Sequence, residues 1–588
     1  MSLIQKLIPL DDLKETAMRF PLSVVCALAL FVIAILEIHD IVEFDDDVIG
    51  RVVVVLGAWY FWFGITQLVG ESKVLDKAKH IALTVVGAGG IVALAVTGPL
   101  WWMHFWYLTP ALLLILMFAP YLKGGDDLSV WFFNRKMWFG VLVSYVALLL
   151  FAAGLCTALW AVHELFGVKV EAEVYADIWA FACLVLGPLY ALSWVPKVFQ
   201  FSEEDCTDPP GLKFIVNWIS APMVFIYLLI LYAYFVKIIV TGEVPNGHLA
   251  YMISGFAGAG IVTYLAAHPL REEGSPQLRL FYRVFFPALL IPVAFHFYAI
   301  WERVNAYGFT EQRYMLAVSA IWFAFLAVGN TFWKLPIKAV PMVLGALMIV
   351  ASFGPWGASG VSGASQYSRL VSVPEANKLL ADGKAVKLEN AEEVLSFDDR
   401  QNISSILQYM CRTERDAMIE DWFEPEEGKD FQCNAYELTK QFGFEYVNRY
   451  LNAVQDDYFN FYHPRRQDVR DVRGYDYILN VNFNGLKANK EITKIWEIEG
   501  VGEIEAEYHE GVLWVMLPAG NILGFDVQEM VEKELKSGRV QNQREMVMED
   551  FIDGSRGRVE LSSVNGEIKD GVPQINRVSF QVLIGGSL

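Results

Sequence analysis

Eleven mainly apolar stretches, each long enough to form a membrane-crossing helix, follow one another through the first 357 residues of the chain. The hydrocarbon core of a bilayer is about 30 Å thick, so a helix needs about 20 apolar residues to cross it. Helices are favoured there because a backbone group without a hydrogen bond is very costly in lipid. We therefore expect residues 1–357 to form an α-helical polytopic membrane bundle. The expected spans lie near 20–38, 51–70, 80–98, 105–122, 138–162, 176–195, 213–240, 248–267, 284–301, 314–332 and 337–356.

The Lys and Arg residues of successive loops predict how these helices are oriented, since cytoplasmic loops carry an excess of both. Sixteen basic residues fall on one side of the expected bundle and five on the other; the sixteen include Arg271, Arg279, Arg283 and Lys334. This bias places the N-terminus in the cytoplasm. An odd number of crossings then carries the C-terminal part to the extracytoplasmic side, whereas a miscount of one span would return it to the cytoplasm.

The rest of the chain has a different composition. From Leu370 onward there are about 40 acidic and 24 basic residues, so this part carries about −16 of the formal net charge of −20. A Gly/Ser-rich segment at 358–372 is typical of a flexible linker, and we expect a soluble extracytoplasmic domain over 373–588. Its negative charge argues against nucleic-acid binding and against docking on anionic lipid, because both require positive charge.

The pattern of apolar residues predicts an α+β fold for this soluble domain. Up to about residue 449 the pattern is typical of short amphipathic helices. Beyond it, the segments 475–483, 511–517 and 576–584 indicate strands, and 525–536 indicates one amphipathic helix.

No enzymatic motif accompanies this fold. The sequence contains no HExxH, GxSxG, Walker-type glycine loop or paired-cysteine zinc spacing, so we expect neither enzymatic activity, nor a cofactor, nor a bound metal. Cys411 and Cys433 are the cysteines of the C-terminal domain. In an extracytoplasmic domain such a pair can form a disulfide. A metal site is the alternative, and it lacks the CxxC or clustered His that would favour it.

Ionisable residues within and beside the spans are candidates for function, because charge is costly in a membrane. His296 lies inside an expected span and needs a hydrogen-bond partner from another helix. A short outer connection is rich in charged and polar residues, which we expect to act as a salt-bridged clasp, to dock the soluble domain or to line a substrate entrance; ordinary interfacial side chains are the alternative. With His296, the candidate binding residues are Glu302, Arg303, Thr310, Glu311 and Arg313.

The stretch IWERVNAYGFTEQRY over residues 300–314 resembles the R-I-x-x-Y-G-L-T-E-x-R-Y signature of a bacterial membrane family catalogued as domain of unknown function 4153. Val304 and Phe309 replace the commoner Ile and Leu. Further similar features occur in the same order at 19–21, 211–245, 268–273, 354–356 and 365–366, and more weakly at 474–477. The resemblance implies a bacterial inner-membrane protein whose molecular role is not established, so it assigns no catalytic residue.

Three hypotheses about function remain open. The first is a non-enzymatic envelope scaffold or sensor, whose external domain binds an envelope protein and whose helices sit in the lipid bilayer. The second is a transporter or flippase for an uncharged or lipid-linked substrate. The third is a membrane-embedded enzyme acting at the outer face, with Glu302, Glu311 or Asp177 as a general base. The sequence does not indicate the substrate, the partner or the oligomeric state.

Overall fold

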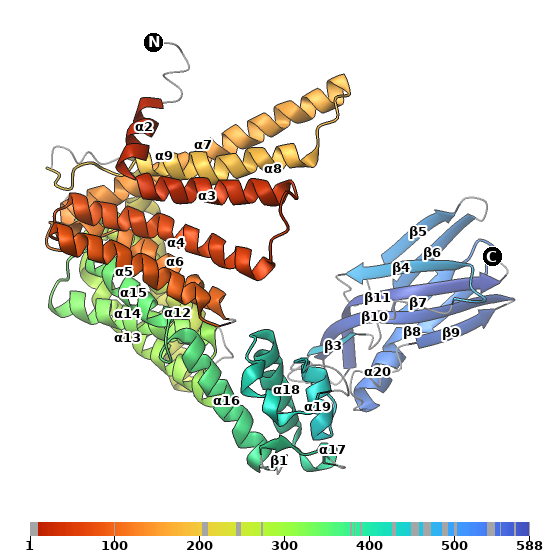
Figure 1. Ribbon diagram of the computed structural model, residues 1–588. Helices are drawn as coiled ribbons and strands as arrows, with labels where there is room; N and C mark the ends of the chain where they lie inside the picture. The colour runs from red at the N-terminus through yellow and green to blue at the C-terminus, as the bar shows by residue number, and fades with distance from the viewer. Residues whose placement is uncertain are drawn as a thin grey trace. The chain divides into compact units, whose positions relative to one another are not determined.

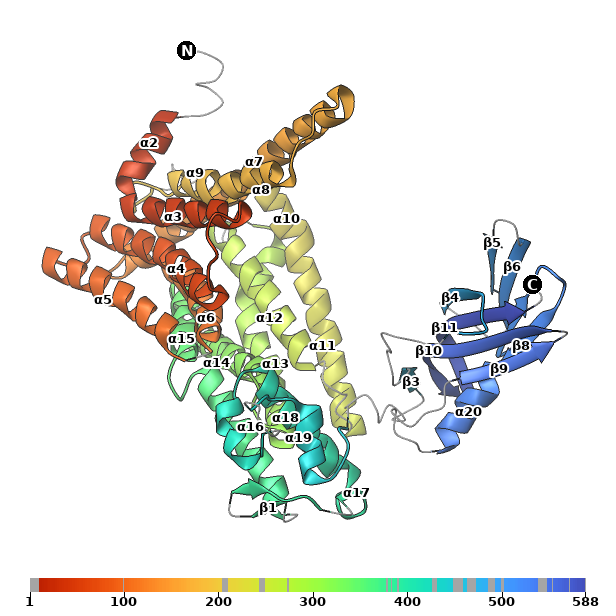
Figure 2. The same cartoon turned by 45° about the vertical axis from the view of Figure 1, so that its right-hand side comes forward.

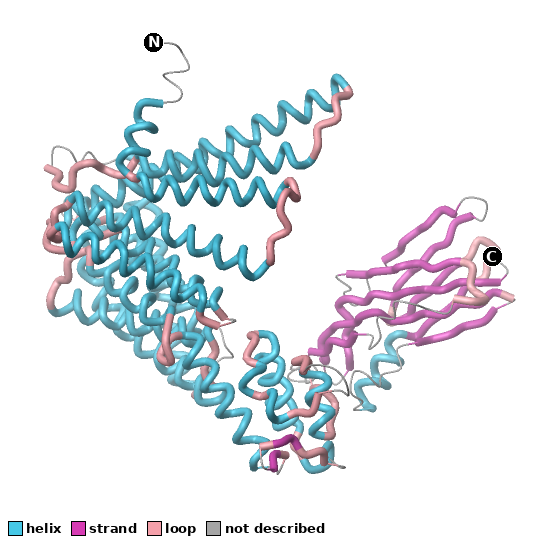
Figure 3. Tube along the Cα trace, viewed as in Figure 1, coloured by secondary structure: helices cyan, strands magenta, loops and turns pink. Residues whose placement is uncertain are grey.

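The computed structural model describes residues 10–586 with several gaps. The residues left out within that range are 99, 203–209, 243–248, 272–273, 377–378, 382, 389–390, 426–430, 448–457, 463–471, 485–491, 499–501, 538–546, 553 and 570–571. The chain divides into two compact units: Met1–Val371 with Thr413–Arg415, and Ser372–Arg412 with Asp416–Leu588. The described part of the first unit is helical, and the described strands belong to the second (Figure 3).

The first unit is a bundle of long apolar helices (Figure 1). Nine described stretches of helix are long and apolar enough to cross a membrane, and two shorter apolar helices, α6 (Trp101–Leu116) and α15 (Ala339–Ser352), bring the number to eleven. Each expected span falls on one of the eleven, so the prediction of a polytopic helical bundle is confirmed. The nine are α3 (Pro21–Ile38), α4 (Asp46–Glu71), α5 (Lys77–Val96), α7 (Asp127–Phe166), α8 to α9 (Ala172–Ser193), α10 to α11 (Gly211–Thr241), α12 (Leu249–Ala266), α13 (Pro276–Tyr307) and α14 (Glu311–Phe332).

One hydrophobic core of this bundle is formed by α11 to α14. Figure 2 shows α11, α12 and α13 side by side. Half of the apolar window of α12 and 44% of that of α13 is buried, against 11% for α5. Glycine contributes to this packing, because a Cβ built at Gly260 of α12 would overlap the ring of Phe285 on α13.

Helix α13 contains two prolines, and a neighbouring helix compensates for one of them. Pro292 has no N–H to donate to the carbonyl oxygen of Ala288, four residues earlier. The hydroxyl of Tyr232 on α11 donates to that oxygen instead, over 2.9 Å. Since an unpaired carbonyl is costly in lipid, this bond allows the proline to remain inside a membrane-spanning helix.

The start of α13 is held by polar contacts. Ser275 is its N-cap, and the Ser275 hydroxyl oxygen accepts a hydrogen bond from the Leu278 N–H at 3.2 Å. The Ser275 N–H in turn donates to the side-chain oxygen of Asn217 at 3.0 Å. Asn217 lies in a π-helical turn, Val216–Ser220, between α10 and α11. These bonds fix the first turn of α13 against the preceding span.

Residues 358–372 differ from the expected flexible linker. They belong to helix α16 (Ala358–Ala376). Gly and Ser are poor helix formers in isolation, but their small size allows close packing here. Ser362 is fully buried, and a Cβ built at Gly360 would come within 2.7 Å of the Gly354 carbonyl oxygen. Tertiary contacts therefore stabilise a helix that composition alone disfavours.

The second unit begins with short helices, as the sequence predicts. They are α17 (Ala391–Val394), α18 (Phe397–Arg412) and α19 (Ala435–Phe442). Cys411, at the end of α18, forms a disulfide with Cys433, just before α19, across a sequence separation of 22 residues. Closing a loop of this length restricts the unfolded chain and stabilises the fold around it.

Two antiparallel sheets and one helix complete the second unit, which makes the α+β prediction correct. The first sheet has the order β3-β10-β11-β4, with β9 also paired to β10, and the second has the order β5-β6-β7-β8. Inward residues of both sheets and of α20 (Val527–Ser537) form one hydrophobic core. The strands are β3 (Tyr458–Tyr462), β4 (Tyr477–Asn484), β5 (Ile492–Ile498), β6 (Gly502–His509), β7 (Val512–Met516), β8 (Ile522–Asp526), β9 (Val547–Ile552), β10 (Ser555–Lys569) and β11 (Val572–Gly586). Two further short strands, β1 (Leu380–Ala381) and β2 (Lys384–Ala385), pair with each other.

Candidate functional site

The charged connection singled out in the sequence is a tight turn between α13 and α14. Gly308 follows the last residue of α13, and its N–H donates to the Val304 carbonyl oxygen at 2.8 Å. Its φ is +68°, a conformation that favours glycine. A Cβ at Gly308 would also lie only 2.9 Å from the Ser365 hydroxyl oxygen. Backbone geometry and space therefore both require glycine at this position.

Helix α16 holds this turn through its polar side chains. The Phe309 N–H donates to the Ser365 hydroxyl oxygen at 2.9 Å. The Gln366 amide donates to the carbonyl oxygens of Tyr307 (2.9 Å) and Phe309 (2.7 Å), and Gln366 is only 4% exposed. Arg369 donates to the carbonyl oxygen of Ala306 at 2.9 Å. The helix thus supplies partners for backbone groups that the turn leaves outside regular helix.

A buried ion pair completes the arrangement. The Arg415 guanidinium donates to the Glu311 carboxylate at 2.9 Å, with the Arg415 side chain 4% exposed and the Glu311 side chain 19% exposed. The same guanidinium donates to the carbonyl oxygen of Ser359 (2.9 Å) and to the Thr413 hydroxyl oxygen (3.1 Å). Arg415 belongs to the segment Thr413–Arg415, which groups with the first unit.

We call this set of residues the clasp. It consists of the turn 307–313, Ser359, Ser365, Gln366, Arg369 and Arg415. Arg313 takes part as well, because its guanidinium donates to the Gly308 carbonyl oxygen at 2.8 Å. Buried charges of this kind are stable only when their hydrogen bonds are satisfied. The geometry favours a structural role for Glu311, since an arginine already holds the carboxylate.

The remaining residues of the predicted cluster are Thr310, within the turn of the clasp, and Glu302 and Arg303, which precede it on α13. Thr310 precedes the first residue of α14, and its side chain makes no capping hydrogen bond. The Arg303 guanidinium lies 5.9 Å from the centre of the Tyr307 ring, on the last turns of α13. Glu302 is the neighbour of Arg303 on the same helix and is partly exposed. None of these three contributes to the hydrogen bonds described above for the clasp.

His296 lies elsewhere in the bundle. It is fully buried in α13, three turns or about 16 Å before the end of the helix. One ring nitrogen, Nε2, lies 3.4 Å from the Ser254 hydroxyl of α12 and 3.2 Å from the Ser319 hydroxyl of α14. The sequence indicates that this residue needs a partner from another helix, and two helices provide one. The structure does not bring His296 together with the charged turn.

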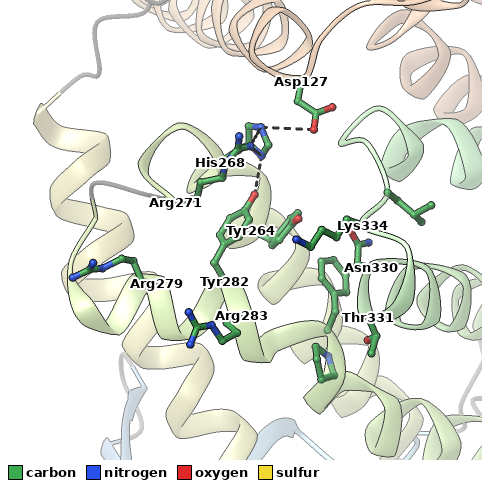
Figure 4. Close-up of a pocket in the computed structure, with 13 residues that line it drawn as sticks. Asp127, Tyr264, His268, Arg271, Arg279, Tyr282, Arg283, Asn330, Thr331 and Lys334 are labelled. Carbon is green, nitrogen blue, oxygen red and sulfur yellow. Dashed lines mark hydrogen bonds and ion pairs between the residues drawn. The ribbon is translucent and has the colours of Figure 1, made fainter.

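A second polar site was not foreseen as a site from the sequence. It is an open cavity of about 780 Å³ at the opposite end of α13 (Figure 4). Arg279 and Arg283 come from α13, whereas Lys334, Asn330 and Thr331 come from the end of α14 and the residues after it. In the sequence these cations indicate only orientation. The sequence feature that could have indicated this site is the spacing of Arg279 and Arg283, which are four residues apart and therefore lie on one helix face.

Other functional candidates from the sequence acquire no further role. Asp177, within α8, lies within hydrogen-bond distance of His39, at 3.0 Å, just after the end of α3. Among the residues that the structure describes, no group of three or more His, Cys, Asp or Glu side chains could hold a metal ion. Arg415 gave no signal in the sequence, because it lies far from Glu311 along the chain.

Comparison with known proteins places the chain in a family. An uncharacterised protein of Pasteurella multocida is 35% identical over 109 residues, which is 18% of this chain and 18% of that protein. No solved structure shows significant similarity. The family model described as a domain of unknown function, DUF4153, matches residues 50–370, more than half of the chain and nearly all of its membrane helices. The chain belongs to the DUF4153 family.

Proposed function

We propose that this protein is a non-enzymatic component of the bacterial inner membrane, a scaffold or sensor whose C-terminal domain lies outside the cytoplasm. On this proposal the domain binds an envelope partner and the helices anchor or relay that contact. The observation that carries the proposal is the buried pair between Glu311 and Arg415. It ties the family signature to a residue of the segment Thr413–Arg415, which is preceded and followed in the sequence by residues of the C-terminal unit.

The distribution of the two sites supports the proposed orientation. The cavity gathers the start of α7, the start of α13 and the end of α14, all of which the loop charges assign to the cytoplasmic side. The clasp gathers the end of α13, the start of α14 and α16, which the same rule assigns to the opposite side. Both groupings agree with the alternation of eleven crossings.

The proposed orientation can be tested with the two cysteines of the C-terminal domain. In spheroplasts, a membrane-impermeant thiol reagent is applied to a variant that retains only Cys411 and Cys433, before and after mild reduction. We expect labelling only after reduction, which is the result for an external domain with an intact disulfide. Labelling that requires breaching the membrane would place the domain in the cytoplasm and overturn the proposal.

The relay is tested by complementation of a deletion strain, with protein levels checked by immunoblotting. We expect Glu311→Arg or Arg415→Glu alone to fail and the double exchange to restore function at least in part, because it restores opposite charges. Glu302→Gln, a neighbouring change outside the clasp, is the control and should complement. Full complementation by a chain that ends after α16 would show that no relay is needed.

A catalytic role for Glu311 gives a different pattern in the same experiment. A general base cannot be moved to position 415 without loss of its geometry, so rescue by the double exchange favours the structural role. Transport is a second candidate, favoured by the open polar cavity between α12, α13 and α14. Flux of a lipid-linked precursor into vesicles, lost in Arg283→Gln, would support transport.

A further inference from the structure

The walls of the cavity combine cationic, polar and apolar side chains. Arg271, Arg279, Arg283 and Lys334 supply four positive charges, and Asp127 is the one carboxylate among the described lining residues. Asn330 and Thr331 add neutral polar groups, and the rest of the lining is formed by Tyr264, His268, Tyr282, Phe286, Pro287 and Leu335. Figure 4 shows Arg279 and Arg283 on one wall and Lys334 with Asn330 and Thr331 on the opposite wall.

One of the four cations, Arg271, has a hydrogen-bond partner within the protein. The Arg271 guanidinium donates to Nε2 of His268 at 2.8 Å. Burial and this neighbouring positive charge lower the pKa of His268 to about 4, so the imidazole is neutral near pH 7. The other ring nitrogen, Nδ1, therefore carries the proton and donates to the Tyr282 hydroxyl at 2.8 Å. Arg271 and His268 thus form a fixed corner of the cavity.

For the remaining three cations, the described part of the chain shows no comparable partner. Among the residues that the structure describes, no carboxylate lies within ion-pair distance of Arg279, Arg283 or Lys334. The Asp127 carboxylate accepts a hydrogen bond from the Ile337 N–H at 3.1 Å and lies 4.0 Å from Nε2 of His268, as Figure 4 shows. Glu272 and Glu273 follow Arg271 in the sequence and lie outside the described residues.

Several like charges around one cavity repel one another, and a bound anion removes that repulsion. Basic residues at the cytoplasmic ends of helices are common. Arg279, Arg283 and Lys334 are likewise exposed, but here they line the same cavity. Two arginines one helical turn apart suit a phosphate, because each planar guanidinium can donate two parallel hydrogen bonds to its oxygens. Lys334, Asn330 and Thr331 can supply further donors from the opposite wall.

We propose that this cavity binds the phosphate group of an anionic ligand, held by Arg279 and Arg283 on one side and by Lys334 on the other. The same chemistry is offered by a phospholipid headgroup and by a soluble phosphoester or diphosphate. Phe286, Pro287 and Leu335 provide an apolar wall beside the cations, as a headgroup with an attached hydrocarbon chain requires. This site is independent of the proposed envelope partner, which concerns the other end of α13.

The start of α13 is suited to holding a ligand in place. Its first turn is fixed by Ser275 and by Asn217 of the preceding span. Arg279 lies in the next turn and Arg283 one turn further. Side chains projecting from an anchored helix lose less conformational freedom on binding than side chains of a mobile loop.

The test uses the full chain purified in a maltoside detergent at constant physiological salt, and binding is followed by tryptophan fluorescence. In one arm the probe is inorganic pyrophosphate. In the other it is dioleoyl phosphatidic acid in mixed micelles, with a neutral diacylglycerol as the lipid without phosphate. The variants are Arg283→Gln, Lys334→Gln and the triple change Arg279→Gln, Arg283→Gln and Lys334→Gln. Lys136→Gln, at an exposed lysine of α7 outside the cavity, is the matched control.

We expect saturable binding of at least one phosphate probe and none of diacylglycerol. Arg283→Gln should weaken it about tenfold or more, since it removes a charged, two-bond contact, and Lys136→Gln should leave it unchanged. Binding of pyrophosphate identifies a soluble ligand class, whereas binding of phosphatidic acid alone identifies a lipid. Absence of binding in both arms, or equal affinity in the triple variant, would overturn the proposal.

A folding defect is distinguished from a binding defect by gel filtration and by the unfolding midpoint without probe. If Arg283→Gln does not fold, Arg283→Lys gives the same test with the charge retained. Lysine cannot form the paired hydrogen bonds of a guanidinium, so binding should weaken severalfold. Unchanged affinity in this variant, together with unchanged affinity in Lys334→Gln, would contradict the assignment.

Discussion

At the C-terminal end of α13, Arg313, Arg369 and Arg415 all donate to identified acceptors in the clasp. At its N-terminal end, about 48 Å away along a helix of 32 residues, Arg279 and Arg283 face a cavity together with Lys334. The two clusters are built from the same residue types on one helix. They differ in whether the surrounding protein supplies hydrogen-bond acceptors and negative charge for the cations.

This difference separates structural from ligand-binding charge. In the clasp, positive charge meets carbonyl oxygens and a partly buried carboxylate, so substitution of an arginine removes a donor from those acceptors. In the cavity, substitution of a cation relieves repulsion as long as no anion is bound. The two sites should therefore respond in opposite directions to the same kind of mutation.

The largest effect is expected for Arg415→Ala. The change removes the buried arginine from the partly buried Glu311 carboxylate and should destabilise the bundle by about 3–5 kcal/mol. The measurement is the thermal unfolding midpoint of the full chain in detergent, followed by tryptophan fluorescence. Arg303→Ala, at an arginine on the last turns of α13, is the control and should lower the midpoint far less. An equal decrease in the unfolding midpoint of the two variants would show that the arginine of the clasp is no more important for stability than its neighbours.

A pH-dependent loss of stability of about 3 kcal/mol is expected from His268. Its pKa is about 4 in the folded protein and close to 6.5 when the chain is unfolded. Between these values the unfolded state binds a proton that the folded state does not, so stability falls as the pH falls from 6.5 to 4. The measurement is the thermal unfolding midpoint of wild type and of His268→Gln at several pH values across this range. The midpoint of wild type should fall more steeply with falling pH than that of His268→Gln. The exposed His163 provides a control, and His163→Gln should retain the wild-type dependence.

Gly308→Ala should destabilise the protein by about 1–3 kcal/mol, because it forces an L-residue into a left-handed conformation and towards Ser365. Gly255→Ala is the matched control. Gly255 lies within α12 with open space around its Cα, so the substitution should be neutral or slightly stabilising. A neutral Gly308→Ala would mean that the turn is not held rigidly by α16.

The smallest expected effect has the opposite sign. Without a phosphate ligand, Lys334→Gln should raise the unfolding midpoint slightly, by less than about 1 kcal/mol in stability, since it removes one of several like charges. With saturating ligand the order should reverse, because wild type alone gains the full binding free energy. A loss of stability in the ligand-free variant would show that Lys334 has a partner like those in the clasp.

The helices could be predicted from the sequence because membrane insertion depends on local apolar length, which each span carries in its own residues. The α+β fold of the C-terminal unit follows from equally local patterns. His296 illustrates an intermediate case: its depth predicts a need for partners, but only the packing of α12 and α14 shows that these are Ser254 and Ser319.

The rest depended on contacts between residues distant in the sequence. Glu311 and Arg415 are separated by 104 positions, and no local pattern links them. Composition suggested a flexible segment at 358–372, whereas packing against the turn makes it helical. The cavity was not predicted because basic residues in loops, such as Arg279 and Lys334, indicate orientation. That three helices bring them together around a cavity cannot be inferred from any single segment.

The membership of Arg415 in the first unit means that this unit is not one continuous stretch of chain. The family match ends at residue 370, before the residue that completes the clasp. A chain cut at that boundary contains every membrane helix, yet Glu311 lacks its buried arginine. During synthesis Glu311 also lacks Arg415 for a time, since Arg415 emerges only after all the spans. The clasp can therefore be completed only after synthesis has passed beyond the membrane region. An isolated bundle retains the complete clasp only if its chain extends past residue 415.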